Sequence, residues 1–234
     1  MYPLLDLVYK QASLQTELFK NPHLRQGIII FLVLTSLLIF FSYWLREEQP
    51  AVYNPSDLNP ALVDRSLQDM NANHTIGPFS LINQNGDTIT EKDYEGKIYV
   101  ADFFFTRCPT ICPVMTNNME KLQTEFLDDA NVKLLSLSVT PEYDSVPVLY
   151  NYASKNGALD AKWNITTGNK RHIYELARKN YFAVVDEGDG GLQDFIHTPN
   201  FVLVDKKKQI RGIYDGTKDE EINRLIKDIR ILKQ

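Results

Sequence analysis

The longest apolar stretch of the chain covers residues 27–45 and carries no charged side chain. As a helix rising about 1.5 Å per residue, it would span about 28 Å, which is close to the hydrocarbon thickness of a bilayer. We therefore expect a transmembrane helix at 27–45. A signal-peptide core is the alternative, but a long segment precedes the stretch, Tyr43 and Trp44 suit a membrane interface, and no small-residue cleavage site follows.

The charges around this stretch predict its orientation. Lys10, Lys20 and Arg25 precede it, whereas Arg46 is the one basic residue that follows closely. The positive-inside rule then places residues 1–26 in the cytosol and the rest of the chain on the other side of the membrane. Residues 1–26 also contain acidic side chains, which mitochondrial transit peptides avoid. We therefore expect a bacterial inner membrane, with the large domain facing the periplasm.

Residues 46–75 contain Pro50, Pro55 and Pro60 and no sustained apolar period. This composition is typical of an extended linker, so we expect a tether here. Regular patterns begin at Ile76, and residues 76–234 have the usual size of a single domain. We expect a chain that begins near Ile76 to be soluble and to bind metal.

Apolar runs alternate with helical apolar spacing along residues 98–179. Runs of strand length predict strands buried on both faces, and a spacing of about 3.6 residues predicts helices between them. The expected strands are 98–105, 132–139 and 162–166, and the expected helices are 113–126, 146–155 and 169–179. Alternation of this kind implies right-handed crossovers and a parallel sheet core.

Beyond residue 199 the pattern changes to two short apolar runs, 200–204 and 210–214, joined by a charged turn. These runs predict an antiparallel hairpin, and the amphipathic spacing over 218–232 predicts a closing helix. The domain is therefore expected to be an α/β fold with a central mixed sheet flanked by helices.

Composition excludes few functions. The net charge of -5 and the absence of a Lys/Arg stripe argue against nucleic-acid binding, which needs many phosphate contacts.

The chain has 2 cysteines, too few for a disulfide framework. A bridge closing so short a loop would contribute only about 2 kcal/mol, so a structural role explains the pair poorly.

Both cysteines, Cys108 and Cys112, lie in a proline-rich turn directly after the apolar run 98–105. Thiolates are soft ligands for copper or zinc, and dithiols exchange electrons with disulfides. The C-x-x-x-C spacing is one residue longer than the usual redox spacing. Two sulfurs on one tetrahedral metal lie about 3.8 Å apart, whereas an S–S bond is about 2.05 Å long. A metal therefore requires less tightening of the loop between the two cysteines than a disulfide does. Spacing therefore favours a metal and leaves a disulfide possible.

The turn leads into a predicted helix. Pro113 suits the first helical position, which makes Cys112 the expected N-cap. Free amide donors and the positive end of the helix dipole stabilise a nearby thiolate, so at least one cysteine should have a pKa below the free value of about 8.5.

A third ligand is expected to be an imidazole, and the chain has 4 histidines. His23 precedes the membrane stretch, His74 lies in the expected tether, and His172 lies on a charged helix, so we interpret all three as solvated. His197 precedes the hairpin and is either a ligand or a structural histidine.

Three further residues near the turn have two interpretations each. Met115 and Met119 lie at helical spacing and are core residues or thioether ligands. Asp102 lies within an apolar strand, where it is a hydrogen-bonded structural group or a proton relay for a thiol.

The order of strand, Cys-Pro-x-x-Cys-Pro turn, helix and a late His-Thr before a hairpin resembles the Sco/SenC family of copper-binding assembly factors for cytochrome c oxidase. The resemblance covers residues 76–234 and implies a thioredoxin-like fold. It further implies that Cys108, Cys112 and His197 together hold one Cu(I) or Cu(II) ion. Residues 186–194 would form the family's insertion near the copper site.

The chain departs from the family pattern in two places. Thr110 replaces an aspartate often found between the cysteines, and Ile196 replaces an acid often found before the histidine. The ligands remain, but the charge around copper changes. Pro199 stands where thioredoxins carry a cis-proline, which keeps disulfide exchange open.

Three functions follow from these patterns. The first is a membrane-anchored copper chaperone that receives copper from a donor protein and passes it to a copper-containing subunit of cytochrome c oxidase, without turnover of a small substrate. The second is a thiol-disulfide oxidoreductase, using Cys108 and Cys112 with a thioredoxin-like reductant, that reduces the cysteines of a copper-site protein. The third is a peroxiredoxin-like peroxidase, although Phe105 stands where those enzymes usually carry a threonine.

Overall fold

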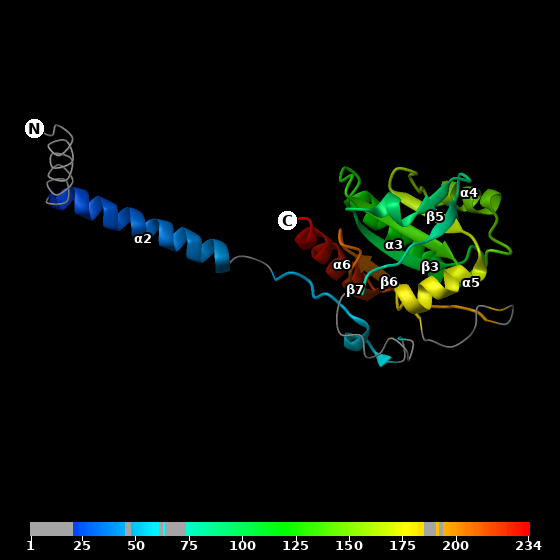
Figure 1. The fold of residues 1–234 in the computed structure, drawn as a ribbon. Coiled ribbons are helices and arrows are strands. Elements are labelled where there is room, and N and C mark those ends of the chain that lie inside the picture. Colours follow the sequence, from blue (N-terminus) through cyan, green and yellow to red (C-terminus); the bar gives the residue numbers. More distant parts are fainter. Residues whose placement is uncertain (1–20, 45–47, 61–62, 64–73, 185–190, 192–193) are drawn as a thin grey trace, which may run out of the picture. The chain divides into compact units, whose positions relative to one another are not determined.

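The computed structural model describes residues 21–44, 48–60, 63, 74–184, 191 and 194–234 (Figure 1). The chain divides into two compact units, Met1–Glu48 and Gln49–Gln234. The first unit contains the helix α2 (Pro22–Trp44), all of whose side chains are at least partly exposed. By length and composition α2 can cross a membrane, and it begins five residues before the expected span. Residues 1–20 of the expected cytosolic segment, and most of the insertion expected at 186–194, lie outside the described residues.

The second unit is built on a seven-stranded mixed sheet with the strand order β2-β1-β5-β4-β3-β6-β7. Its parallel core, β5-β4-β3, is the one predicted, and β6 and β7 form the predicted antiparallel hairpin. The strands are β1 (Ser80–Asn83), β2 (Thr88–Thr90), β3 (Ile98–Phe104), β4 (Val132–Ser138), β5 (Trp163–Thr167), β6 (Asn200–Val204) and β7 (Ile210–Asp215).

Helices cover both faces of this sheet. Because side chains alternate along each strand, each central strand contributes residues to the core on either face. In β3, Val100 and Phe104 face the core beneath α3 (Ile111–Glu125), α4 (Val146–Lys155) and α6 (Asp219–Leu232). The intervening Tyr99 and Phe103 face the other core, beneath α5 (Lys170–Glu175) and the π-helical turn η4 (Leu176–Asn180). Every residue of β3 is buried, as the apolar run predicted.

The structure differs from the predicted elements at a few boundaries. The β1–β2 hairpin was not predicted, because its strands have only four and three residues. Its turn is stabilised by Asn83, whose Oδ1 accepts hydrogen bonds from the backbone N–H groups of Asn85 and Asp87. The expected helix 169–179 is instead α5 followed by η4. The described part of the second unit also contains two short 3-10 turns, η1 (Pro55–Asp57) and η3 (Glu91–Tyr94).

The expected tether differs most, because its described residues contact the domain. Tyr53 pairs with Ile210 at the edge strand β7, with a 2.9 Å bond from its N–H to the carbonyl oxygen. The guanidinium of Arg211 donates to the carbonyl oxygens of Pro50 and Ala51. Val63 is buried in the core with α5. The compact unit therefore begins near Gln49 rather than at Ile76.

We expect truncation at Ile76 to destabilise the domain. Removing residues 49–75 uncovers the edge of β7 and removes Val63 from the core, which should lower the free energy of unfolding by about 3 kcal/mol. Urea unfolding of chains 49–234 and 76–234, compared side by side, measures this difference. Equal stability of the two chains would show that residues 49–75 contribute nothing to the core.

Candidate metal centre

The cysteine turn connects the end of β3 to the start of α3. Cys108 lies in the loop, and Cys112 is the second residue of α3, with Thr110 rather than Cys112 at the N-cap position. The predicted N-cap is therefore wrong by two residues. Pro113 still fits in the first turn, where its missing N–H has no helical partner anyway. Both cysteines are buried, with exposed fractions of 6% and 3%.

The loop that carries His197 approaches this turn from β6. The residues on either side of His197 fix the loop: Ile196 is buried, and the hydroxyl of Thr198 donates to the carbonyl oxygen of Ala183 at 2.8 Å. His197 itself is exposed. Its Nε2 lies 3.9 Å from the Sγ of Cys108, although the two residues are 89 positions apart. The Thr198–Pro199 peptide bond is trans.

The separation of these two atoms is close to that of two ligands on one metal. With metal–sulfur and metal–nitrogen bonds of about 2.3 and 2.0 Å, the two atoms lie about 3.5 Å apart at a tetrahedral angle and about 3.7 Å apart at a trigonal angle. Among the described residues, however, no three Cys, His, Asp or Glu side chains already have the spacing of a formed metal site. To hold one ion together, Cys108, Cys112 and His197 would have to move from the positions they have here.

The two thiols differ in acidity. Burial alone would raise the pKa of Cys108, but hydrogen bonds from the backbone and side chains of Thr110 and Cys112 outweigh it and lower the pKa to about 6. Burial raises the pKa of Cys112 to about 12, and the neighbouring Cys108 and Asp102 add to this rise. The lowered pKa of Cys108 agrees with the prediction of an acidic cysteine at this turn. In a dithiol reaction, Cys108 would therefore be the nucleophile and Cys112 its protonated partner.

We expect this difference to appear in alkylation of the reduced protein. A thiolate reacts and a thiol does not, so modification of Cys108 should rise with pH around a midpoint near 6. Cys112 should stay largely unmodified at neutral pH. Mass spectrometry after brief iodoacetamide treatment between pH 4 and 9 measures both sites. Two cysteines with the same midpoint near 8.5 would contradict the assignment.

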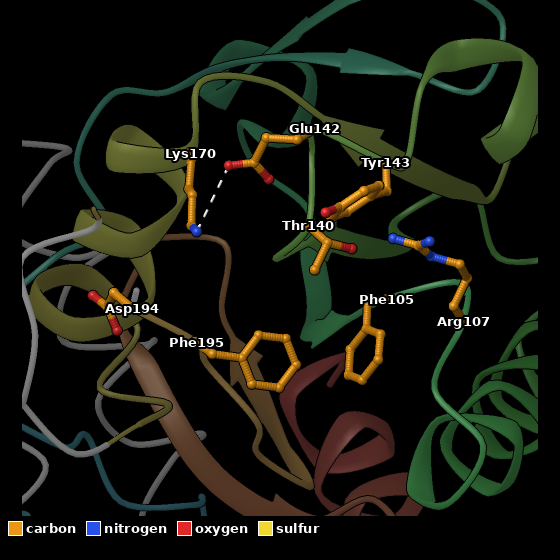
Figure 2. Close-up of a pocket in the computed structure, with 8 residues that line it drawn as sticks. All are labelled: Phe105, Arg107, Thr140, Glu142, Tyr143, Lys170, Asp194 and Phe195. Carbon is orange, nitrogen blue, oxygen red and sulfur yellow. Dashed lines mark ion pairs between the residues drawn. The ribbon is translucent and has the colours of Figure 1, made fainter. Parts of the chain in front are cut away.

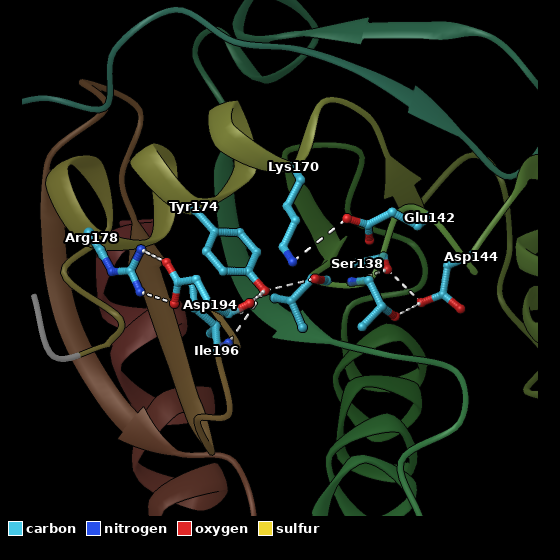
Figure 3. Close-up of polar contacts among 10 residues, drawn as sticks. Ser138, Glu142, Asp144, Lys170, Tyr174, Arg178, Asp194 and Ile196 are labelled. Atoms are coloured by element: carbon cyan, nitrogen blue, oxygen red, sulfur yellow. Dashed lines mark hydrogen bonds and ion pairs between the residues drawn. The ribbon is translucent and has the colours of Figure 1, made fainter. Parts of the chain in front are cut away.

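Asp144 fixes the amino-terminal part of the cysteine loop. This buried carboxylate accepts hydrogen bonds from the backbone N–H and the hydroxyl of Thr106, at 3.3 and 2.6 Å. It also accepts bonds from the hydroxyls of Ser138 and Thr140, at 2.5 and 2.9 Å (Figure 3). Because Thr106 precedes Cys108 by two residues, Asp144 connects the cysteine loop to the end of β4.

A second set of contacts fixes the histidine loop. Arg178 and Asp194 form a buried pair with two parallel bonds of 2.7 Å (Figure 3). The Tyr174 hydroxyl lies 3.0 Å from the carbonyl oxygen of Val139 and 3.2 Å from that of Asp194, and it accepts a bond from the Ile196 N–H at 3.4 Å. These bonds hold Asp194 and Ile196, the residues of the loop just before His197, against α5, η4 and the end of β4.

Replacement of Asp144 by alanine should loosen the cysteine loop. It leaves buried donors on Thr106 and Ser138 without their acceptor, so the free energy of unfolding should fall by about 3 kcal/mol. Asp144→Asn retains one acceptor oxygen and should lose less. Urea unfolding measures both, with Asp128→Ala, at an exposed position before β4, as the matched control. An Asp144→Ala protein as stable as the control would contradict this role.

The other candidate residues lie in the core or on the surface of the protein. Met115 and Met119 are fully buried core residues of α3, as one interpretation predicted. Asp102 is buried and accepts a hydrogen bond from the hydroxyl of Ser136, and burial raises its pKa to about 7. His23 is exposed on α2.

His172 is half-buried on α5. His74 was predicted to be solvated, and this is wrong. Its ring is buried, its Nε2 lies 2.8 Å from the carbonyl oxygen of Asn180, and it packs on Phe182 at 4.6 Å.

Sequence reasoning did not identify the aromatic residues around His197. The ring of Phe195 stacks on the imidazole at 6.4 Å, and the ring of Phe105 lies 6.1 Å from it. Thr110 was noted as a departure, but its contact with the Cys108 sulfur at 3.6 Å was not expected. Asp144 was also not identified, because its contact with the cysteine loop is to Thr106, 38 positions away in the sequence.

Comparison with known proteins gives consistent matches. The family model described as SCO1/SenC matches residues 68–233. The SCO1 protein homolog of Bacillus subtilis (strain 168) is 32% identical over 160 residues, which are 68% of this chain and 82% of that protein.

Two solved structures match as well. BsSco, described with a disulfide switch and as a member of the Sco family of cytochrome c oxidase assembly proteins, is 31% identical with a TM-score of 0.59, over 69% of this chain and 95% of that one. Arabidopsis thaliana ScoI, solved with copper bound, is 25% identical with a TM-score of 0.51, over 67% and 98% of the two chains. The thioredoxin-like fold expected from the resemblance is confirmed.

Proposed function

Because this chain belongs to the SCO1/SenC family, we propose that it is a membrane-anchored copper chaperone that delivers copper to a copper centre of cytochrome c oxidase during assembly. Copper is the cargo, and Cys108, Cys112 and His197 are its ligands. The observation that carries the proposal is the approach of His197 Nε2 to Cys108 Sγ across 89 residues. Copper in the solved ScoI of Arabidopsis thaliana supports the choice of metal.

The donor set suits a carrier. Two thiolates and one imidazole favour copper over hard cations, and three ligands leave a coordination position open to an incoming group. Cys108 has a lowered pKa and so needs little deprotonation to bind, whereas Cys112 must release a proton. His197 is exposed on its loop and is the ligand that a recipient's donor group can replace first.

The proposed location follows from α2. We propose that this helix anchors the chain in a bacterial inner membrane, and the flanking basic residues Lys20 and Arg25 support a periplasmic position for the compact unit Gln49–Gln234. Copper would come from a donor protein in that compartment.

Copper content of the oxidase tests the proposed function. In cells that lack this protein, cytochrome c oxidase should contain little copper and show little activity. The wild-type gene should restore both, and a gene encoding Cys108→Ser with Cys112→Ser should not. An oxidase with full copper content and activity in cells without the protein would overturn the proposal.

A second candidate function is thiol-disulfide exchange with a copper-site protein, and the unequal thiols favour it. The Cys108 thiolate would attack a partner disulfide, forming a mixed disulfide and releasing one partner thiolate, which takes a proton. Cys112 would then lose its proton and attack the Cys108 sulfur, releasing the second partner thiol and leaving a Cys108–Cys112 disulfide. A thioredoxin-like reductant must restore the dithiol. His197 takes no part in these steps.

A further inference from the structure

A cavity of about 490 Å³ lies beside the candidate metal centre (Figure 2). Its walls come from the cysteine loop after β3, the loop after β4, the start of α5 and the histidine loop. The lining residues are Phe105, Arg107, Thr140, Glu142, Tyr143, Lys170, Asp194 and Phe195. The cavity thus lies outside the carboxyl ends of parallel strands, where open α/β sheets bind their ligands.

Aromatic rings form much of the wall. Phe105 and Phe195 meet edge to face with their centroids 5.1 Å apart, and Figure 2 shows both rings at one side of the hollow. Phe195 is 54% exposed and Tyr143 is 61% exposed, although both are large side chains that gain free energy when covered. An apolar side chain that entered the cavity would bury all three rings.

The charges around the cavity are unequally compensated. Lys170 lies 3.6 Å from Glu142, and Asp194 pairs with Arg178. The guanidinium of Arg107 lies 3.8 Å above the ring of Tyr143. Within the described part of the chain, no carboxylate lies at ion-pair distance from Arg107. The cavity therefore offers an aromatic wall beside one positive charge that can accept a carboxylate.

The cavity is continuous with the metal centre. Phe105 and Phe195 are the rings that pack against His197, and Arg107 directly precedes Cys108. A chain held in the cavity would therefore lie next to the ligands that have to exchange copper. A free small molecule would gain nothing from this proximity, whereas a protein that receives copper requires it.

We propose that this cavity is the docking site of the protein that receives copper from Cys108, Cys112 and His197. The docking segment packs an apolar side chain against the exposed faces of Phe105 and Phe195 and places a carboxylate on Arg107. This inference rests on the proposed function and adds to it the surface that selects the recipient. Arginine and aromatic residues are the types that commonly dominate binding at protein interfaces.

Binding to the recipient tests the proposal. The probe is the soluble copper-binding domain of the cytochrome c oxidase subunit from the same organism, added to the full-length, reduced protein in lipid nanodiscs. Calorimetry gives the affinity of the complex without copper, and a second experiment follows transfer of one Cu(I). The variants are Tyr143→Ser, Arg107→Gln and Arg107→Lys. The control is Lys206→Gln, which removes an exposed positive charge from the β6–β7 turn, at the end of the strands opposite the cavity.

We expect Tyr143→Ser and Arg107→Gln each to weaken the complex by about tenfold. The control should bind as the wild type does, and Arg107→Lys should bind between the two. Arg107→Gln should also make the affinity less dependent on salt, because the screened ion pair is gone. Tyr143→Ser should keep the copper affinity of the isolated protein.

The outcomes separate the two proposals. Wild-type affinity in both Tyr143→Ser and Arg107→Gln would overturn the docking site and leave the copper carrier intact. A complex that forms and is weakened by these variants, but in which no copper moves, would support the docking site and overturn the delivery role. No binding of the wild type to this domain, or self-association of the wild type that both variants abolish, would overturn the docking site.

Discussion

Replacing Cys108 by serine is expected to abolish copper binding and oxidation of the dithiol together. Cys108 is the acidic thiol of the pair and the one whose sulfur approaches His197. A serine hydroxyl is a hard, protonated group at neutral pH and replaces neither the soft ligand nor the redox partner. Copper content after loading and dialysis, together with free-thiol counting after mild oxidation, measures both losses.

The Cys108→Ser protein should remain folded, because the substitution exchanges one sulfur atom for a smaller oxygen atom and leaves the rest of the side chain unchanged. Thr110→Ser provides the matched control, since it changes a neighbour of the same sulfur without removing a proposed ligand. Copper bound by Cys108→Ser with wild-type affinity would exclude the turn as the copper site.

Replacing His197 by alanine should weaken copper binding by at least about 100-fold while leaving the dithiol oxidisable. The imidazole is exposed, and Ile196 and Thr198 hold the loop, so its removal should not unfold the domain. A competition titration with a Cu(I) chelator measures the affinity, and the rate of disulfide formation measures the dithiol.

His172→Ala is the matched control for this variant, because it removes a half-buried imidazole from α5. Its copper affinity should equal that of the wild type. If His197→Ala also binds copper as tightly as the wild type, the three-ligand site is rejected, and thiol-disulfide exchange becomes the better account of the two cysteines.

The long elements were predictable because each has its own local pattern. β3 and β4 are apolar on both faces, and α6 combines an apolar stripe with acidic residues in its first turn, where they suit the helix dipole. The β1–β2 hairpin has strands too short to show a period. The start of α3 was misplaced because proline is acceptable at any position of the first turn, so Pro113 does not mark a single boundary.

The parts of the site that depend on distant contacts were not predictable from local pattern. His74 and Tyr53 lie in a stretch that is polar and proline-rich, and their positions depend on contacts with η4 and β7 that are distant in the sequence. The approach of His197 to Cys108 likewise depends on its neighbours. The Ile196 N–H donates to the Tyr174 hydroxyl, and the Thr198 hydroxyl donates to the Ala183 carbonyl oxygen. The residues supplied candidate ligands, and the family resemblance selected His197 among them.

X-ray absorption at the copper edge tests the central claim most directly, using the reduced wild-type protein loaded with one equivalent of Cu(I). The account predicts two sulfur neighbours at about 2.3 Å and one imidazole nitrogen at about 2.0 Å. The nitrogen should disappear in His197→Ala. A wild-type spectrum with sulfur neighbours and no nitrogen, unchanged by that substitution, would contradict it.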